Sequence, residues 1–432
     1  MKPEKVFRRY DIRGEYPGEI NGEFAERLGR ALGTFARENF GEKVVVGRDN
    51  KDSSVELKAK LVKGLVSTGV KVYDAGEGPT DYLAFAASRK NAVGVQVTSS
   101  HMPLDFNGFK FVYPEGNGFV NEDLYKVQDL FRAGDFVEGD GSVTGNNLHD
   151  EYREQLKSYF EKFFDSVEKK VVVDTLGGAA TGFLPRLLEE LGADVIDISE
   201  EREGIYVDPP EPKPGLLEHV ERRFEEEGAD LALATDMDAD RIALYFKGEW
   251  VSGDELFALF ARLVEGDVVA SVDTSPAVEE LVESRGDSIY YTRVGDPFVI
   301  SEMIETGSTL SGEPNGHYCF PEFVNYNSGT LAGLLLAGMN LEEELEAAPD
   351  YFTERRSVEV EDKNAVMEEV TRHAREEYDV INEMDGVKFS AGGATVLVRP
   401  SGSSPVVRVI AQARDGSEAG DMAEEVAAVI GK

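Results

Sequence analysis

Lys43–Asp49, KVVVGRD, is a short run of β-branched residues that ends in an aspartate, and the same pattern returns twice. Lys170–Asp174 reads KVVVD, and Val268–Asp273 reads VVASVD. Each run leads into a polar or glycine-bearing loop and then into helical periodicity, which is typical of a parallel α/β layer. The separations are domain-sized and too long for a solenoid repeat. We interpret the runs as three related α/β domains in series, with three unrelated buried strands as the competing interpretation.

Other periodic segments continue the alternation of strands and helices. Strands are predicted at Val70–Asp74, Ala92–Val97, Asp230–Thr235, Ile242–Phe246 and Ser288–Thr292. Helices are predicted at Phe24–Glu38, Glu56–Ser67, Gly182–Leu191, Leu216–Glu227 and Gly253–Val264. Alternating strands and helices predict mainly parallel sheets, and therefore the α/β fold class.

Three loops interrupt this alternation. Gly139–Asn147, GDGSVTGNN, is interpreted as a linker between the first and second domains. Val207–Gly215 contains four prolines and is predicted to be a rigid, exposed loop. Gly177–Gly182, GGAATG, resembles a dinucleotide-binding fingerprint but has Ala179 where that motif needs glycine, so a tight strand-to-helix turn is favoured.

The last part of the chain has a different pattern, that of a smaller α+β domain. Its predicted elements are the strands Ser357–Glu361, Ala394–Arg399 and Val406–Ala413 and the helices Ala365–Glu377 and Gly416–Ile430. We therefore expect four domains, at residues 1–145, 146–247, 248–354 and 355–432.

Composition limits the classes of partner. The chain has 432 residues, 41% of them hydrophobic, and a formal net charge of −38 from 45 basic and 83 acidic residues. Such a charge repels phosphate backbones and anionic lipid, so no nucleic-acid or membrane partner is expected. The acidity is spread along the chain and suggests a halophilic-type surface, with an ordinary acidic protein as the alternative. Cys319 is the only cysteine, and neither a signal peptide nor an apolar run of membrane-spanning length is seen, so a cytoplasmic location is expected.

The first candidate site is Val95–Lys110, VQVTSSHMPLDFNGFK. A predicted buried strand leads into Ser100 and His101, and parallel sheets bind ligands at the carboxyl ends of their strands. The hydroxyl could act as a nucleophile and the imidazole as an acid, a base or an orienting group. Taken alone, the segment favours a turn rich in serine and proline over a catalytic site.

The second candidate site is Leu231–Leu244, LALATDMDADRIAL. Asp236, Asp238 and Asp240 share one loop between two apolar strands, where their mutual repulsion favours a bound cation. Carboxylate oxygens select Mg²⁺, Mn²⁺ or Ca²⁺. An EF-hand is excluded, because Arg241 occupies the position that needs glycine. A strand that ends in Asp-x-Asp also fits a phosphatase with Asp236 as its nucleophile.

Two further loops carry polar groups suited to a sugar phosphate. Ser311–His317, SGEPNGH, offers glutamate, asparagine and histidine side chains that could bind sugar hydroxyls. Arg399–Arg408, RPSGSSPVVR, places two arginines around a hydroxyl-rich, glycine-containing turn. Backbone amides, hydroxyls and guanidinium groups together can bind a phosphate.

Taken together and in this order, the motifs resemble the α-D-phosphohexomutase family, most closely its phosphomannomutase/phosphoglucomutase members. The resemblance covers the whole chain. Phe7–Gly14 is similar to the family's opening segment, and Thr98–Pro103, TSSHMP, to its phosphoserine loop. Thr235–Arg241, TDMDADR, resembles its metal loop. SGEPNGH resembles its sugar-specificity loop, and RPSGSSP its phosphate-binding loop.

The resemblance implies three similar α/β domains and a smaller α+β domain around a central cleft. It implies a cytoplasmic phosphoprotein of carbohydrate metabolism, an isomerase that moves a phosphoryl group between the 1- and 6-positions of mannose or glucose. Mg²⁺ and a hexose 1,6-bisphosphate are the implied cofactor and intermediate, and sugar phosphates the partners of a monomer or homodimer. The implied catalytic residues are Ser100, His101, Lys110, Arg241 and Arg13, and the implied metal ligands are Asp236, Asp238, Asp240 and Ser100. The implied substrate-binding residues are Tyr10, Arg293, Glu313, Asn315, His317, Arg399, Ser401, Gly402 and Ser403.

Several residues depart from the family pattern. Met102, Met237 and Asn315 replace the usual Asn, Gly and Ser. These changes bear on substrate preference and rate more than on reaction class. The alternatives are a phosphoglucosamine mutase, an aspartate-nucleophile phosphatase and a non-catalytic sugar-phosphate-binding protein.

Overall fold

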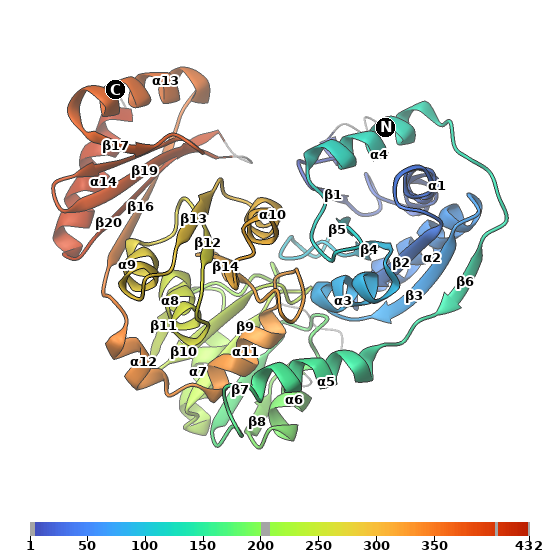
Figure 1. Ribbon diagram of the computed structural model, residues 1–432, viewed down its shortest axis with the longest axis horizontal. Coiled ribbons are helices and arrows are strands. Elements are labelled where there is room, and N and C mark those ends of the chain that lie inside the picture. The colour runs from blue at the N-terminus through green and yellow to red at the C-terminus, as the bar shows by residue number, and fades with distance from the viewer. Residues whose placement is uncertain (1–4, 200–207, 402–404, 431–432) are drawn as a thin grey trace. The chain divides into compact units, whose positions relative to one another are not determined.

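A computed structural model describes residues 5–199, 208–401 and 405–430 (Figure 1). The chain divides into two compact units. One unit comprises Met1–Val251 with Asn315–Leu341, and the other comprises Ser252–Pro314 with Glu342–Lys432. Among the described helices, none is long and apolar enough to cross a membrane.

The first unit opens with a six-stranded sheet of order β1-β5-β4-β2-β3-β6. Its strands are β1 (Asp11–Glu15), β2 (Lys43–Arg48), β3 (Lys71–Glu77), β4 (Val93–Val97), β5 (Phe106–Val112) and β6 (Ser142–Gly145). β4, β2, β3 and β6 run parallel, whereas β5 pairs antiparallel with both β4 and β1. The predicted linker at Gly139–Asn147 is therefore wrong in part, because β6 pairs with β3 as an edge strand. All four residues of β6 are exposed, so the segment lacks the apolar run that marks a buried strand.

Four helices accompany this sheet: α1 (Gly22–Asn39), α2 (Asp52–Val66), α3 (Thr80–Lys90) and α4 (Asn121–Ala133). Asn21 caps α1 by accepting hydrogen bonds from two backbone N–H groups of its first turn. Alternate valines of β4 join the core with α1, α2 and α4. Gly94 has the opposite orientation, and a Cβ added to it would approach Leu83 and Ala87 of α3. Helices therefore cover both faces of the sheet, as expected for parallel strands.

The second sheet of this unit has the order β11-β10-β9-β7-β8. Its strands are β7 (Lys170–Asp174), β8 (Asp194–Asp197), β9 (Leu231–Thr235), β10 (Ile242–Phe246) and β11 (Glu249–Val251). β8, β7 and β9 are parallel, and β10 returns antiparallel to β9. The turn between β9 and β10 is the predicted metal loop. The unit also contains α5 (His149–Phe160), α6 (Leu184–Glu190), α7 (Glu218–Glu227), β15 (His317–Cys319) and α11 (Gly329–Gly338).

The second unit contains a parallel arrangement in which β12 lies between β13 and β14. These strands are β12 (Val268–Ser271), β13 (Ile289–Thr292) and β14 (Leu310–Glu313), with the helices α8 (Gly253–Leu263), α9 (Pro276–Ser284) and α10 (Asp296–Thr306). Ser252 begins α8 with a capping box, in which its side chain and that of Glu255 each bond the other's backbone N–H. The helix α12 (Leu341–Ala347) follows α11 in sequence.

The C-terminal part of the same unit is an antiparallel sheet of order β16-β20-β19-β18-β17. Its elements are β16 (Phe352–Glu359), α13 (Lys363–Glu377), β17 (Asp379–Asn382), β18 (Val387–Ala391), β19 (Ala394–Pro400), β20 (Val406–Ala413) and α14 (Gly416–Ile430). The fold class is confirmed: three α/β sheets precede a five-stranded antiparallel sheet of α+β type. Every predicted strand and helix overlaps an observed element of its kind. The strands β17 and β18 were not predicted. In β17, exposed and half-buried residues alternate without an apolar run that would indicate a strand.

Candidate functional site

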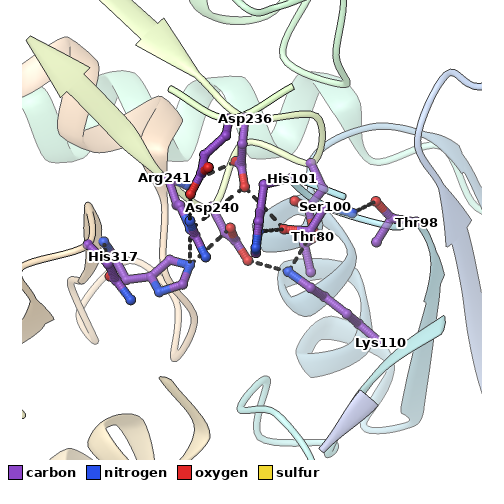
Figure 2. A network of polar contacts seen from close by, with 12 residues as sticks. Thr80, Thr98, Ser100, His101, Lys110, Asp236, Asp240, Arg241 and His317 are labelled. Carbon is purple, nitrogen blue, oxygen red and sulfur yellow. Dashed lines mark hydrogen bonds and ion pairs between the residues drawn. The ribbon is translucent and has the colours of Figure 1, made fainter. Parts of the chain in front are cut away.

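The loop after β4 presents the hydroxyl of Ser100 to the aspartate loop (Figure 2). Ser100 is 1% exposed and has a φ of 52°, a left-handed conformation that is uncommon for a residue with a side chain. Its N–H donates to Thr98 Oγ1 at 3.0 Å. Its Oγ lies 3.1 Å from Asp236 Oδ2 and 3.2 Å from His101 Nδ1. The turn therefore aims one hydroxyl at a carboxylate and an imidazole together.

Lys51 supports this loop from the N-terminal end of α2. Its Nζ donates to Phe106 O at 2.6 Å and to Ser99 Oγ at 3.3 Å. The side chain is buried, and that burial lowers the pKa of Lys51. Sequence reasoning did not select Lys51, because a lone lysine near a helix start has no local signal of such a role.

The metal loop places three fully buried carboxylates, those of Asp236, Asp238 and Asp240, between β9 and β10. One oxygen from each lies within 4.8 Å of the others. Burial, followed by the charges of Asp240 and Asp238, raises the pKa of Asp236 well above its usual range. Burial also acts to raise the pKa of Asp240, but Lys110 and His317 outweigh it and hold that pKa well below the usual range.

The hydrogen bonds of the Asp238 carboxylate indicate whether the triad can bind a metal ion. Its Oδ2 accepts a hydrogen bond from Thr80 Oγ1 at 2.8 Å and lies 2.7 Å from Lys110 Nζ. Its Oδ1 is buried and has no hydrogen-bond partner among the described residues. A buried carboxylate oxygen without a partner is costly unless a cation binds it. The three hard oxygen donors fit Mg²⁺ or Mn²⁺.

Basic side chains reach this loop from the paired strands β1 and β5. Asp11 lies opposite Lys110, and Arg13 lies opposite Gly108. The side chains of Asp11, Arg13 and Lys110 therefore share one face of the sheet. Lys110 makes ion pairs with both Asp238 and Asp240. Arg13 Nε is 2.6 Å from Asp11 Oδ2. Burial acts to lower the pKa of Arg13, but Asp11 and then Asp238 outweigh it and raise that pKa.

Arg241 and His317 lie at the other side of the aspartates (Figure 2). His317 Nε2 is 3.2 Å from Arg241 Nε and 3.2 Å from Asp240 Oδ1. Arg241 also approaches Glu211, with 3.4 Å between NH1 and Oε1. Burial, and then the charges of Arg241 and Arg13, lower the pKa of His101 far below its ordinary value.

Two close backbone approaches fix the shape of the metal loop. A Cβ on Gly178 would lie 2.6 Å from Met237 O, and the N–H of Ala179 donates to that same oxygen at 2.7 Å. A Cβ on Gly329 would lie 2.3 Å from Arg241 O. The glycine-rich turn after β7 therefore packs against the metal loop. Met237 itself is fully buried.

Asp81, one residue into α3, is a buried carboxylate that links three helices. Its Oδ2 accepts from Tyr152 Oη of α5 at 2.9 Å and from Ser328 Oγ, and its Oδ1 accepts from the N–H of Tyr82. Ser328 in turn caps α11 through Leu331 N at 3.0 Å. Burial raises the pKa of Asp81 to about 7, against the lowering effect of these hydrogen bonds.

This pKa predicts a pH dependence of stability that Asp81→Asn removes. Between about pH 4 and pH 7 the folded state keeps a proton that the unfolded state releases, so the free energy of unfolding falls as the pH rises. The slope should become less negative in Asp81→Asn by up to about 1.4 kcal/mol per pH unit. Urea unfolding followed by circular dichroism from pH 4 to pH 8 measures it. Asp129→Asn, at an exposed carboxylate of α4, is the control. An unchanged slope in Asp81→Asn would contradict the prediction.

Four sequence-predicted residues lie in the second unit, and one of them, Glu313, contacts the segment Arg293–Asp296 directly. Glu313 is buried at the end of β14, and its Oε1 accepts the N–H of Gly295 at 2.9 Å. The guanidinium of Arg293 lies 3.7 Å from the ring centroid of Phe298. Ser401 is buried after β19. The fourth residue, Arg399, lies one residue before the end of β19.

Arg399 is held in a defined orientation by Asp385. Its Nε and NH2 lie 3.0 and 2.8 Å from Asp385 Oδ2, which also accepts the N–H of Val294 at 3.4 Å. Arg399 is paired directly opposite Arg408 across β19 and β20. Like charges at such positions destabilise a sheet unless an anion offsets them. Gly402 and Ser403 of the predicted phosphate loop lie outside the described residues.

The remaining predicted residues belong to the first unit. Asn315 Oδ1 accepts the N–H of His317 at 3.2 Å, so it shapes the turn before β15. Tyr10 is half-buried just before β1, and its charged form acts to raise the pKa of Arg13. The first unit thus brings together Ser100, His101, Lys110, Arg13, Arg241, His317 and the three aspartates. Thr80 joins them, although sequence reasoning missed it.

The first unit therefore holds a hydroxyl, a candidate divalent-cation site and several cationic groups, which is a set of groups suited to phosphoryl transfer. The chain matches four domain families in order along its length. They are described as phosphoglucomutase/phosphomannomutase domain I, at residues 4–138, domain II, at 150–249, domain III, at 252–351, and the C-terminal domain, at 357–429.

Relatives that align over nearly the whole chain have names from the same family. The phosphoglucomutase/phosphomannomutase of Thermococcus kodakarensis is 32% identical over 97% of each chain. A probable phosphoglucosamine mutase of Methanothermobacter thermautotrophicus is 33% identical over 97% of this chain and 96% of the relative. The structure of a phosphoglucomutase/phosphomannomutase family protein from Burkholderia thailandensis superposes with a TM-score of 0.88 at 24% identity, covering 99% and 97% of the two chains. The chain belongs to the phosphoglucomutase/phosphomannomutase family of α-D-phosphohexomutases.

Proposed function

We propose that this phosphohexomutase interconverts the 1-phosphates and 6-phosphates of mannose and glucose by way of a phosphoryl group on Ser100. Family membership gives the reaction class. The observation that carries the proposed role of Ser100 is the 3.1 Å approach of its Oγ to Asp236 Oδ2 in the candidate metal site. A phosphoryl group on that oxygen would lie beside both the aspartates and the cationic groups.

Transfer from phosphoserine needs an acceptor hydroxyl in line with the bond that breaks. The sugar oxygen forms a bond to phosphorus as the bond between phosphorus and Ser100 Oγ breaks, which gives a hexose 1,6-bisphosphate. His101 and Lys110 are the two candidates for taking the hydroxyl proton and returning it in the second half-reaction. Arg13 and Arg241 would bind the oxygens of the moving phosphoryl group.

Asp236, Asp238 and Asp240, with an oxygen of the phosphorylated Ser100, would hold Mg²⁺. The bound ion would offset negative charge on the phosphoryl oxygens. Within the protein, Lys110 and Arg241 already offset part of the charge of the triad. The assignment is supported by Asp238 Oδ1, which has no hydrogen-bond partner in the part of the chain that the structure describes.

The bisphosphate must exchange its two phosphates at Ser100, so the phosphate that is not being transferred needs its own binding group. Arg399 and Ser401, with Gly402 and Ser403, are proposed for that role, supported by the orientation that Asp385 gives Arg399. Glu313 and His317 are proposed to bind sugar hydroxyls in both orientations. Tyr10, Arg293 and Asn315 are proposed as further substrate contacts.

The choice of sugar is tested by assaying mannose 1-phosphate, glucose 1-phosphate and glucosamine 6-phosphate side by side, primed with glucose 1,6-bisphosphate. The opening segment of the chain, with its YDIRG sequence, favours the first two. We expect kcat/KM for both to exceed that for glucosamine 6-phosphate by about tenfold or more, because a polar site discriminates between substituents it pairs and those it does not. The reverse order would support phosphoglucosamine mutase, the alternative in the name of the second relative, a probable phosphoglucosamine mutase. Binding without turnover of any sugar would identify a non-catalytic protein.

A further inference from the structure

The N-terminus of α3 is attached to the metal loop through Thr80, the first residue of the helix. The N–H of Thr80 donates to the backbone oxygen of Asp238 at 3.0 Å, and its Oγ1 donates to Asp238 Oδ2 at 2.8 Å. Both residues are fully buried, although 158 positions separate them in the sequence. One threonine thus bonds the main chain and the side chain of the same aspartate.

A second helix, α11, also contacts the metal loop with its N-terminus. The N–H of Gly329, the first residue of α11, donates to Ala239 O at 2.9 Å. Asp81 joins the two helix starts, because it follows Thr80 directly and accepts a hydrogen bond from Ser328, the cap of α11. The positive ends of two helix dipoles therefore face a loop that carries three buried carboxylates.

The hydrogen bond from Thr80 distinguishes the two oxygens of Asp238. Oδ2 is occupied by the threonine hydroxyl and by Lys110, whereas Oδ1 has no partner among the described residues. Rotation of the carboxylate would exchange the two oxygens and break the bond to the buried hydroxyl. The hydroxyl therefore fixes the carboxylate with one defined oxygen free.

We propose that Thr80 is a positioning residue for the metal site, which holds Asp238 so that Oδ1 serves as the metal ligand. This inference rests on the proposed function of the aspartate triad. Thr80 acts through Asp238 and through no contact with the metal ion. Partners that orient a metal ligand in this way typically contribute 10- to 100-fold to metal affinity.

The test measures Mn²⁺ binding to the full-length, unphosphorylated protein by electron paramagnetic resonance, in the absence of substrate. Thr80→Val keeps the shape and removes the hydroxyl, and we expect its dissociation constant for Mn²⁺ to rise by about tenfold or more. Thr80→Ser keeps a hydroxyl at this position. Its dissociation constant for Mn²⁺ should lie within about threefold of that of the wild type, a smaller change than the loss of such a partner causes. Thr68→Val is the matched control, because it removes a buried hydroxyl that donates to Leu65 O.

Two results would overturn the proposal: wild-type affinity in Thr80→Val, or equal weakening in Thr80→Val and Thr80→Ser. If Thr80→Val does not fold, Thr80→Ala and Thr80→Ser carry the same comparison, because alanine and serine differ only in the hydroxyl. Failure of the proposed metal site itself gives a different result. In that case the wild type binds no Mn²⁺, and Asp238→Ala changes nothing.

Discussion

Ser100→Ala should lower mutase turnover by roughly 10⁴-fold or more, because the variant lacks the oxygen that we propose carries the phosphoryl group between the two half-reactions. The side chain is buried and its hydroxyl contacts Asp236 and His101, so alanine fits the space that serine occupies. Binding of the sugar phosphate should change little, and the loss should appear in kcat. Coupled assays primed with glucose 1,6-bisphosphate measure the turnover.

Mass spectrometry with site mapping separates this result from the phosphatase alternative. After incubation with glucose 1,6-bisphosphate, the wild type should carry phosphate on Ser100 and the variant should carry none. Ser99→Ala is the matched control, because it removes the adjacent hydroxyl, which accepts a hydrogen bond from Lys51. Phosphate found on Asp236, or full activity in Ser100→Ala, would identify an aspartate nucleophile.

Asp240→Asn should have the second large effect. Asp240 makes an ion pair with Lys110 and a contact with His317, so asparagine keeps the size of the side chain but removes the charge that holds both groups. We expect Mn²⁺ binding to weaken about 100-fold or more, and turnover to fall by roughly 10³-fold. Isothermal titration with Mn²⁺ and the coupled assay measure the two effects.

The control for Asp240→Asn removes a charge at the start of β9, the strand that leads into the metal loop. Asp230 is exposed just before β9, and Asp230→Asn lowers the net negative charge equally without touching the loop. Circular dichroism checks that both variants are folded. If Asp240→Asn binds Mn²⁺ as the wild type does, Asp240 is not a metal ligand.

The sequence carries enough information to predict most of the fold and the residues of the metal loop. Apolar runs such as Lys170–Asp174 coincide with buried parallel strands, and the alternating aspartates lie in the loop that follows β9. Such features are local, and periodicity or spacing reveals them directly. The fully exposed strand β6 has no such pattern, so the sequence predicts a linker at this position.

The contacts that orient the site could not be predicted in the same way. Thr80 and Asp238 are far apart in the sequence, and nothing in the residues around Thr80 indicates a partner in another sheet. Lys51 meets the Ser100 loop only because α2 begins beside β4 and β5. Long-range pairings of single polar groups depend on tertiary packing, which has no period in the sequence.

Ser100 has a left-handed backbone conformation, for which glycine would be the most stable residue. Its proposed role in phosphoryl transfer requires a side-chain hydroxyl instead. Glycine is the residue that adopts this conformation without steric cost, and a side chain there costs about 1 kcal/mol or more. A chain selected for rigidity alone would lose the hydroxyl at this turn. Because the chain has serine at this position, the surrounding loop, anchored by Thr98 and Lys51, must offset the free-energy cost of the left-handed conformation. The proposed nucleophile thus lowers the stability of the chain at its own position.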